Sequence, residues 1–306
     1  MKNSLYYKQA DLLIRILPHV AEEPDFALHG GTAINFFVRG LPRLSVDIDL
    51  TYLPVESRED TLRHIGEKLR IIAQKIRKTI SGVRVEEKID KTSGAVTKLF
   101  ANQQGALVKI EPNLIIRGAV SACEERELSK EARDFFEKSV SVKMLSFQDL
   151  YGSKICAALD RQHSRDFFDV KILLENEGIT DAVRKSFLVY LISHNRPMYE
   201  VLAPRLKDLR PVFEKEFLGM TRIAVTCEEL ERVRKELIAK VRSMLTPDER
   251  EFLMSFKERT PKWQLLGVEG AERLPAVRWK LANLEKIERG KHKVTVARLK
   301  KALELS

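Results

Sequence analysis

Apolar residues recur along this chain in two different rhythms, and the change falls near residue 178. Before it, runs with helical spacing over residues 4–20 and 58–81 are joined by strand-like runs over residues 83–88, 97–102, 106–116 and 140–145. After it, strand patterns nearly vanish, and helical spacing continues over residues 180–195, 205–218, 226–245, 247–258 and 275–305. The pattern predicts an α+β fold, in which a mixed β-sheet flanked by helices (residues 1–178) is followed by an all-helical C-terminal domain (residues 179–306).

The segment over residues 26–37 joins a short apolar run to a glycine pair. Residues 26–28 are typical of a buried strand, and Gly30 and Gly31 let the backbone turn tightly and come close to a ligand. From Thr32 onward, the spacing of apolar residues predicts the first turns of a helix. The N–H groups at such a helix start suit phosphate, although a lone glycine pair is more often only a turn.

Two aspartates follow on an alternating run that ends at residue 50. Strand geometry directs Ser45, Asp47 and Asp49 to one face and the apolar residues between them to the other. Two carboxylates on one face repel each other unless a cation lies between them, and Mg²⁺ favours carboxylate and phosphate oxygens. A lone Asp-x-Asp is usually a solvated strand edge. Its place after the glycine pair, with Arg43 and Ser45 just ahead, favours a site for a nucleoside triphosphate and metal.

A third carboxylate is expected, because two-metal sites usually contain one. The run over residues 106–116 alternates and places Leu107, Lys109 and Glu111 on one strand face. Glu111 is therefore the candidate for the third metal ligand. The alternative is an ordinary edge-strand charge, which Pro112 favours because proline is tolerated mainly at sheet edges.

A second group of charges lies over residues 154–169. A helix over residues 149–161 would place Lys154 and Arg161 on nearly one face, two turns apart. Ser164 is then a candidate N-cap for a second helix to about residue 175, on which Asp166 and Asp169 are neighbours. The alternative is an exposed ion pair on that helix. Its phenylalanines indicate a packed helix instead, in which the charges need partners.

These motifs resemble those of a known enzyme group. The order Gly30-Gly31-Thr32-Ala33, then Arg-x-Ser-x-Asp-x-Asp-Leu over residues 43–50, resembles the first motif of the nucleotidyltransferase superfamily. More narrowly, the chain is similar to the AbiEii/AbiGii toxin family of type IV toxin–antitoxin and abortive-infection (phage-defence) systems. The later motifs of that family contain the same Lys and Arg-Asp-x-x-Asp pattern. Related enzymes often have Asp where this chain has Glu111.

The resemblance implies a nucleotidyltransferase-like sheet and a metal-dependent transfer of NMP from an NTP to a hydroxyl group. The implied metal is Mg²⁺ or Mn²⁺, held by Asp47, Asp49 and Glu111. Lys154 would supply positive charge to the phosphates, Asp166 would act as a base or orient Lys154, and Asp169 would hold Arg161 or Arg165. The triphosphate would be bound by Gly30, Gly31, Thr32, Arg43 and Ser45.

The resemblance also implies a growth-arresting toxin with a cognate antitoxin encoded nearby. Related members add nucleotides to the 3′ end of tRNA, so the leading acceptor is RNA, and tRNA in particular. Two alternatives stay open. The acceptor is a small molecule or a protein side chain in one, and the chain is an inactive nucleotidyltransferase module that binds RNA or a partner in the other. The residues themselves do not identify the base, the target or the oligomeric state.

Composition agrees with this interpretation without deciding it. The chain has 306 residues and a formal net charge of +10, which favours a polyanionic partner. The three cysteines have no metal-ligand spacing, and no long apolar segment or signal-peptide pattern is visible, so we expect a soluble cytoplasmic protein. The basic stretches over residues 232–242 and 289–301 are either solvated helix faces or RNA contacts. Trp263 and Trp279 are either core anchors or base-stacking residues.

Overall fold

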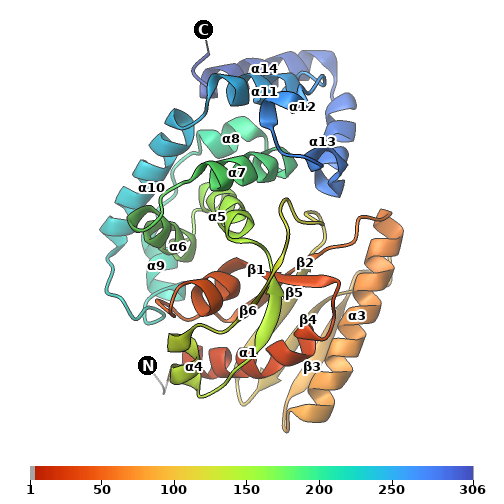
Figure 1. The fold of residues 1–306 in the computed structure, drawn as a ribbon, viewed down its shortest axis with the longest axis vertical. Coiled ribbons are helices and arrows are strands. Elements are labelled where there is room, and N and C mark those ends of the chain that lie inside the picture. Colours follow the sequence, from red (N-terminus) through yellow and green to blue (C-terminus); the bar gives the residue numbers. More distant parts are fainter. Residues whose placement is uncertain (1–3, 306) are drawn as a thin grey trace. The chain divides into compact units, whose positions relative to one another are not determined.

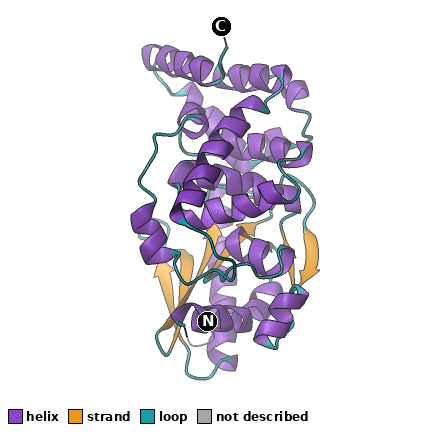
Figure 2. Ribbon diagram, turned by 90° about the vertical axis from the view of Figure 1, so that its left-hand side faces the viewer, coloured by secondary structure: helices purple, strands orange, loops and turns teal. Residues whose placement is uncertain are grey.

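The computed structural model describes residues 4–305, which group into two compact units (Figure 1). The first unit contains the described residues up to Ser146 together with Leu218–Ala224, and the second contains Phe147–Phe217 and the described residues from Val225 onward. All strands of the described chain belong to the first unit, and the second consists of helices and loops (Figure 2). The predicted α+β class, with a mixed sheet and C-terminal helices, is confirmed.

One sheet organises the first unit, and its described residues form seven strands in the order β3-β4-β5-β2-β1-β7-β6. β2 runs parallel to β5 and β1 parallel to β7, whereas the other neighbouring strands are antiparallel. The sheet is therefore mixed. Its strands are β1 (Phe26–His29), β2 (Asp47–Tyr52), β3 (Arg84–Ile89), β4 (Val96–Gln103), β5 (Ala106–Asn113), β6 (Glu124–Glu127) and β7 (Ser141–Met144).

Two long helices pack against this sheet. α1 (Leu5–Ala21) lies against β5, and α3 (Arg58–Thr79, orange in Figure 1) lies against β3 and β4. The Ser57 hydroxyl caps α3 by accepting the Asp60 N–H at 3.1 Å. Contact with β4 is close at Gly66, where a Cβ would lie 3.1 Å from the backbone nitrogen of Val96.

Burial alternates along the central strands, which gives this part of the sheet two different faces. Ile48 and Leu50 of β2, like Val108 and Ile110 of β5, are fully buried in the core. The residues between them are half exposed or exposed, because successive side chains of a strand point to opposite faces. The polar face therefore carries the candidate residues of β2 and β5.

Helices joined by loops make up the described part of the second unit. Five of these helices begin at a side-chain cap, and Thr226 and Thr246 each form a capping box with a glutamate three residues later. The helices are α5 (Phe147–Arg161), α6 (Ser164–Glu175), α7 (Asp181–Ser193), α8 (Met198–Leu202), α9 (Arg210–Glu216), α10 (Cys227–Ser243), α11 (Pro247–Lys257), α12 (Trp263–Leu266), α13 (Pro275–Glu285) and α14 (Arg289–Ala302).

The grouping of α5 and α6 differs from the predicted division at residue 178. In the structure both helices belong to the helical unit, because α5 packs closely along α7. A Cβ on Gly152 would lie 2.7 Å from the Phe187 nitrogen, and the Ser186 hydroxyl donates to the buried Asp149 carboxylate at 2.9 Å. When the units are defined by their internal contacts, the boundary between the sheet unit and the helical unit therefore falls between residues 146 and 147.

Some predicted elements end differently. The predicted helix over residues 275–305 is broken into α13 and α14, because the Glu288 carboxylate caps a new helix by accepting the N–H groups of Gly290 and Lys291. The predicted helix over residues 205–218 is shorter and begins at Arg210. β6 and the short helix α4 (Lys130–Phe136) were not predicted.

The tryptophans of the helical unit have different environments. Trp263 packs against Phe252 and Phe256, with ring centroids 5.5 and 6.1 Å away, so it is a core anchor. Trp279 is 48% exposed. Within residues 4–305, no helix has both the length and the apolar character that crossing a membrane requires.

Candidate active site

The glycine bend of the first unit lies directly against the acidic strand. β1 pairs antiparallel with β2, so that His29 is opposite Asp49, and the bend begins at the next residue. Gly30 has a φ of +73°, and a Cβ there would lie 2.5 Å from Oδ2 of Asp49. A Cβ on Gly31 would lie 2.6 Å from Nη2 of Arg43. Side chains from the following strand segment therefore occupy the space beside both glycines, and the positive φ of Gly30 further favours glycine there.

After the bend, the chain forms an unusual helical segment. The short α2 (Gly30–Thr32) continues into a π-helix, η1 (Ala33–Val38), where sequence predicted an ordinary helix. The Thr32 hydroxyl donates to the backbone oxygen of Asp47 at 2.6 Å, and the Asn35 amide donates to the oxygen of Gly31 at 2.8 Å. Thr32 is fully buried, so its hydroxyl proton holds the helix start to β2 and does not support its predicted role as a phosphate ligand.

Arg43 and Ser45 lie beneath the bend. Their residues are 2% and 5% exposed, and the Ser45 hydroxyl would lie 3.2 Å from a Cβ on Gly31. The Arg43 guanidinium donates to the Leu44 oxygen at 2.9 Å. This segment is held by residues that return late in the chain, since Leu44 N–H donates to Met220 O at 2.8 Å. Because Arg43 is buried and bonded to the backbone, its environment favours a role in bracing the bend over the expected contact with the triphosphate.

Asp47 and Asp49 share the polar face of β2 with charges on β5. The parallel register places Lys109 opposite Asp47 and Glu111 opposite Asp49. Burial lowers the pKa of Lys109, but the hydrogen bond to Glu111 and the negative charges of Asp47, Glu111 and Asp49 raise it overall. Lys109 is thus a cation held beside the aspartate pair.

Glu111 is bound by two lysines. Its carboxylate pairs with Lys109 at 2.7 Å and with Lys98 of β4. Burial raises the pKa of Glu111, but the hydrogen bonds from Lys109 and Lys98 lower it overall, so the group is ionised. Within residues 4–305, no group of three or more His, Cys, Asp or Glu side chains is arranged to hold a metal ion. To act as the predicted third metal ligand, the Glu111 carboxylate would have to break its ion pairs with Lys98 and Lys109.

In the second unit, Lys154 pairs with both aspartates of the predicted charge group, whereas Asp169 was expected to hold Arg161 or Arg165. Lys154 Nζ lies 2.9 Å from Asp166 Oδ1 and 3.0 Å from Asp169 Oδ2, and all three side chains are at most 5% exposed. Arg161 donates to the two oxygens of Asp166 at 2.5 and 2.8 Å. Lys154 and the two aspartates therefore pair away from water, whereas the Arg161 side chain is 58% exposed and reaches Asp166 from the surface. The ammonium of Lys154 has three N–H donors, of which the aspartates use two.

Asp166 serves this cluster as an ionised anchor. Burial raises its pKa, but the charges of Lys154 and Arg161 and their hydrogen bonds hold it well below the ordinary value. Of its two predicted roles, this environment supports the orientation of Lys154 over proton abstraction. One local prediction was wrong: the N-cap of α6 is His163, whose Nδ1 accepts the Arg165 N–H at 3.1 Å, and Ser164 is the first helical residue.

Sequence reasoning missed Lys98 and Phe100 as members of the polar face. Alternation along the run over residues 97–102 would have placed both on one face of a strand. Which face that was depends on the pairing of β4 with β5, and pairing is a long-range property. The register, with Phe100 opposite Lys109, supplies that information.

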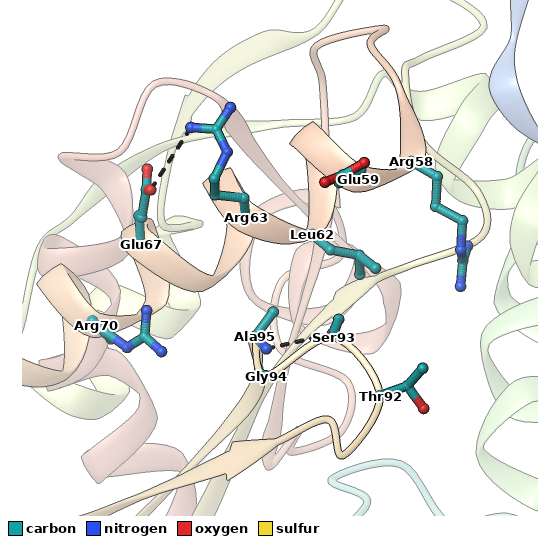
Figure 3. Close-up of a pocket in the computed structure, with 10 residues that line it drawn as sticks. All are labelled: Arg58, Glu59, Leu62, Arg63, Glu67, Arg70, Thr92, Ser93, Gly94 and Ala95. Carbon is teal, nitrogen blue, oxygen red and sulfur yellow. Dashed lines mark hydrogen bonds and ion pairs between the residues drawn. The ribbon is translucent and has the colours of Figure 1, made fainter.

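A cavity of about 710 Å³ elsewhere in the first unit involves none of the candidate residues. It lies between the first half of α3 and the loop before β4 (Figure 3). Arg63 and Glu67 face each other across one helical turn at 3.9 Å, while Thr92 and Ser93 belong to the loop. Because α3 packs on the opposite face of the sheet from Asp47, this cavity is separate from the candidate site.

Comparisons with known proteins were consistent with each other. The family model described as the nucleotidyl transferase AbiEii toxin of type IV toxin–antitoxin systems matches residues 11–283. The fold is similar to that of MenT4, a nucleotidyltransferase toxin from Mycobacterium tuberculosis H37Rv, with a TM-score of 0.60 and 14% sequence identity. This similarity covers 92% of the chain and 93% of MenT4, and at such low identity it shows the fold alone. No curated protein sequence matches the chain.

Proposed function

The chain belongs to the AbiEii family of nucleotidyltransferase toxins, and on this premise we propose that it transfers NMP from an NTP to the 3′ end of an RNA, with tRNA as the leading acceptor. The observation that supports the proposal best is the contact between the glycine bend and Asp49, where a Cβ on Gly30 would lie 2.5 Å from the carboxylate. This contact places backbone N–H groups, which suit phosphate, beside carboxylates that suit a divalent cation.

Asp47 and Asp49 are the proposed ligands of that cation, Mg²⁺ or Mn²⁺. They fit it by donor type, because both are carboxylates on one strand face. A bound divalent cation would offset phosphate charge and lower the pKa of the attacking hydroxyl. Glu111 is a weaker candidate for a third ligand, since Lys98 and Lys109 hold its carboxylate.

In the proposed reaction, a hydroxyl oxygen of the acceptor bonds to the α-phosphorus of the NTP. The bond between that phosphorus and the oxygen bridging to the β-phosphate breaks, pyrophosphate leaves, and the hydroxyl proton passes to water. Gly30 and Gly31 would hold the triphosphate through backbone N–H groups, with the Ser45 hydroxyl as a further donor. Arg43 and Thr32 would keep this bend in place.

From the second unit, we propose Lys154 as a catalytic residue that supplies positive charge to the reaction. Asp166 and Asp169 are its positioning residues, because both carboxylates lie within 3.0 Å of its ammonium. A cation buried between two fixed anions keeps one orientation, and so needs little reorganisation during the reaction.

The test uses the purified full chain, total RNA and each labelled NTP in the presence of Mg²⁺. We expect label in RNA, removable from its 3′ end, and no label with Asp47→Asn. Glu59→Gln is the matched control, because Glu59 is an exposed acid on α3 and should retain full activity. Label that enters protein or small molecules but never RNA would overturn the proposed acceptor. A wild-type chain that transfers nothing to any acceptor would overturn the activity itself.

A further inference from the structure

Two rows of side chains cross the polar face of the sheet and end at the two aspartates. In the first row, Glu86 of β3 is opposite Phe100 of β4, which is opposite Lys109 of β5, which is opposite Asp47. Because cross-strand neighbours lie side by side, these four residues form a line across four strands.

The second row is the more basic one. Lys88 of β3 is opposite Lys98 of β4, and Lys98 forms an ion pair with Glu111, which is opposite Asp49. Like charges directly opposite each other on a sheet are destabilising. Glu111 offsets one of the two lysines, and within residues 4–305 Lys88 forms no ion pair. The row therefore favours an additional anion beside Lys88 and Lys98.

This surface is accessible to a ligand. Lys88 is exposed, the Lys98 and Lys109 side chains are 36% and 33% exposed, and Phe100 is half exposed. Leu107, one position further along the same face of β5, is 42% exposed. In the described part of the chain, the ring of Phe100 stacks on no other aromatic ring. We call these five residues, Lys88, Lys98, Phe100, Leu107 and Lys109, the lysine platform.

The platform and the glycine bend lie on opposite sides of the aspartates. In the sheet order β3-β4-β5-β2-β1, the bend follows β1, whereas the platform occupies β3, β4 and β5. β2, which carries Asp47 and Asp49, lies between them. If the triphosphate is held at the bend, the acceptor can approach the aspartates from the side of β5.

We propose that the lysine platform binds the single-stranded 3′ end of the acceptor RNA, with one base stacked on Phe100 and backbone phosphates on Lys88, Lys98 and Lys109. This proposal rests on the function proposed above. A sheet that presents an aromatic ring among lysines has the chemistry by which proteins hold single-stranded nucleic acid, since stacking tolerates any base and ammonium groups follow the backbone.

The experiment measures binding and transfer separately, on the full chain. Binding is followed by the fluorescence anisotropy of a short labelled single-stranded RNA, without NTP or metal. We expect Phe100→Ala to weaken binding about tenfold and Phe100→Tyr to retain it, because stacking on one aromatic ring has about that effect. Ile71→Ala, which removes an exposed apolar side chain from α3, is the control.

The lysines are tested by salt dependence. We expect Lys88→Ala to weaken binding and to reduce the slope of log affinity against log salt by about 0.7, as for the loss of one phosphate contact on a single strand. Lys78→Ala, an exposed lysine in the last turn of α3, should leave the slope unchanged. In the transfer assay, the KM for RNA should rise in Phe100→Ala and Lys88→Ala while the KM for NTP stays constant.

The outcomes separate this inference from the proposed function. Unchanged RNA binding in both variants, with normal transfer by the wild-type chain, would overturn the platform and leave the function standing. Weakened binding in both variants, with no transfer by the wild-type chain, would support the platform and overturn the function. A rise in the KM for NTP alone would show that the face holds the nucleotide base, and would overturn the inference.

Discussion

Gly30 shows how strictly a single residue is specified at the bend. Its φ of +73° disfavours any side chain, and a Cβ would meet the Asp49 carboxylate at 2.5 Å. Gly105 also has a positive φ, of +84°, but nothing lies within 4 Å of its Cβ position. An alanine at Gly105 would therefore cause backbone strain alone, whereas an alanine at Gly30 would cause strain and also displace the Asp49 carboxylate.

We expect Gly30→Ala to abolish nucleotide transfer, because Asp49 must move to make room for the methyl group. The free energy of unfolding should fall by about 1–3 kcal/mol from strain and crowding. Gly105→Ala, the matched control, should cost stability through strain but leave transfer intact. Transfer rates and thermal unfolding of both variants check the prediction, which fails if Gly30→Ala is as active as Gly105→Ala.

Asp166 makes stability depend on pH. Its pKa in the folded chain is lower than in the unfolded chain, so the folded state binds the proton more weakly. The ionised Asp166 carboxylate therefore stabilises the folded chain at pH values above the ordinary carboxyl pKa of about 3.9. This stabilisation is lost as the pH falls below that value.

We expect the free energy of unfolding to fall more steeply below about pH 4 in the wild-type chain than in Asp166→Asn. At neutral pH, Asp166→Asn should be about 3–5 kcal/mol less stable, because the buried Lys154 ammonium loses one of its anions. Denaturant unfolding across this pH range measures both effects. Asp181→Asn, whose side chain is 85% exposed, is the control, and equal pH slopes in all three proteins would contradict the prediction.

At the scale of elements, the packing of α5 on α7 depends on a missing side chain. A Cβ added to Gly152 would lie 2.7 Å from the backbone nitrogen of Phe187. Backbone atoms cannot move aside as the end of a flexible side chain can. Cys156, one turn later, contacts the same residue through a 3.7 Å Sγ to backbone oxygen hydrogen bond. The two helices are therefore in close contact over at least one turn.

We expect Gly152→Ala to lower the melting temperature clearly, with a loss of about 1–3 kcal/mol from overpacking. Alanine would otherwise stabilise a helix by up to about 1 kcal/mol relative to glycine, so the sign of the effect is informative. Ser153→Ala, half exposed on the same helix, should be nearly neutral. A Gly152→Ala protein that is more stable than the wild-type chain would show that α5 and α7 are not in contact here.

Elements also show what the sequence can reveal. The amphipathic spacing of α1 and α3 and the alternation in β3, β4 and β5 are local signals, and these elements were predicted within a few residues. The π-helix after Thr32 was not, because the spacing of apolar residues does not distinguish its wider turn from that of an ordinary helix over so few residues. The pairing of Glu111 with Lys98 was not predicted either, because strand register is set by contacts between distant segments.

At the scale of the whole molecule, the family assignment predicts an effect on cells. We expect overexpression of the wild-type chain to arrest bacterial growth and Asp47→Ala to remove the arrest while the protein still folds, because a half-exposed side chain such as that of Asp47 contributes little to stability. Growth curves, with circular dichroism of the purified variant, measure the two effects. Arrest that persists with a folded Asp47→Ala protein would show that toxicity does not come from nucleotide transfer.

The crossing of the chain between its two units has a practical consequence. Leu218–Ala224 belongs to the first unit, where Arg43 bridges to Thr221 and the Arg222 N–H donates to the Pro42 oxygen at 2.8 Å. A chain truncated anywhere between residues 147 and 217 would thus contain the sheet but lack residues 218–224, which pair with the loop that follows the glycine bend. Expression of the first unit in isolation therefore requires residues 218–224 to be attached to it, and a split protein divided within these residues should reassemble poorly.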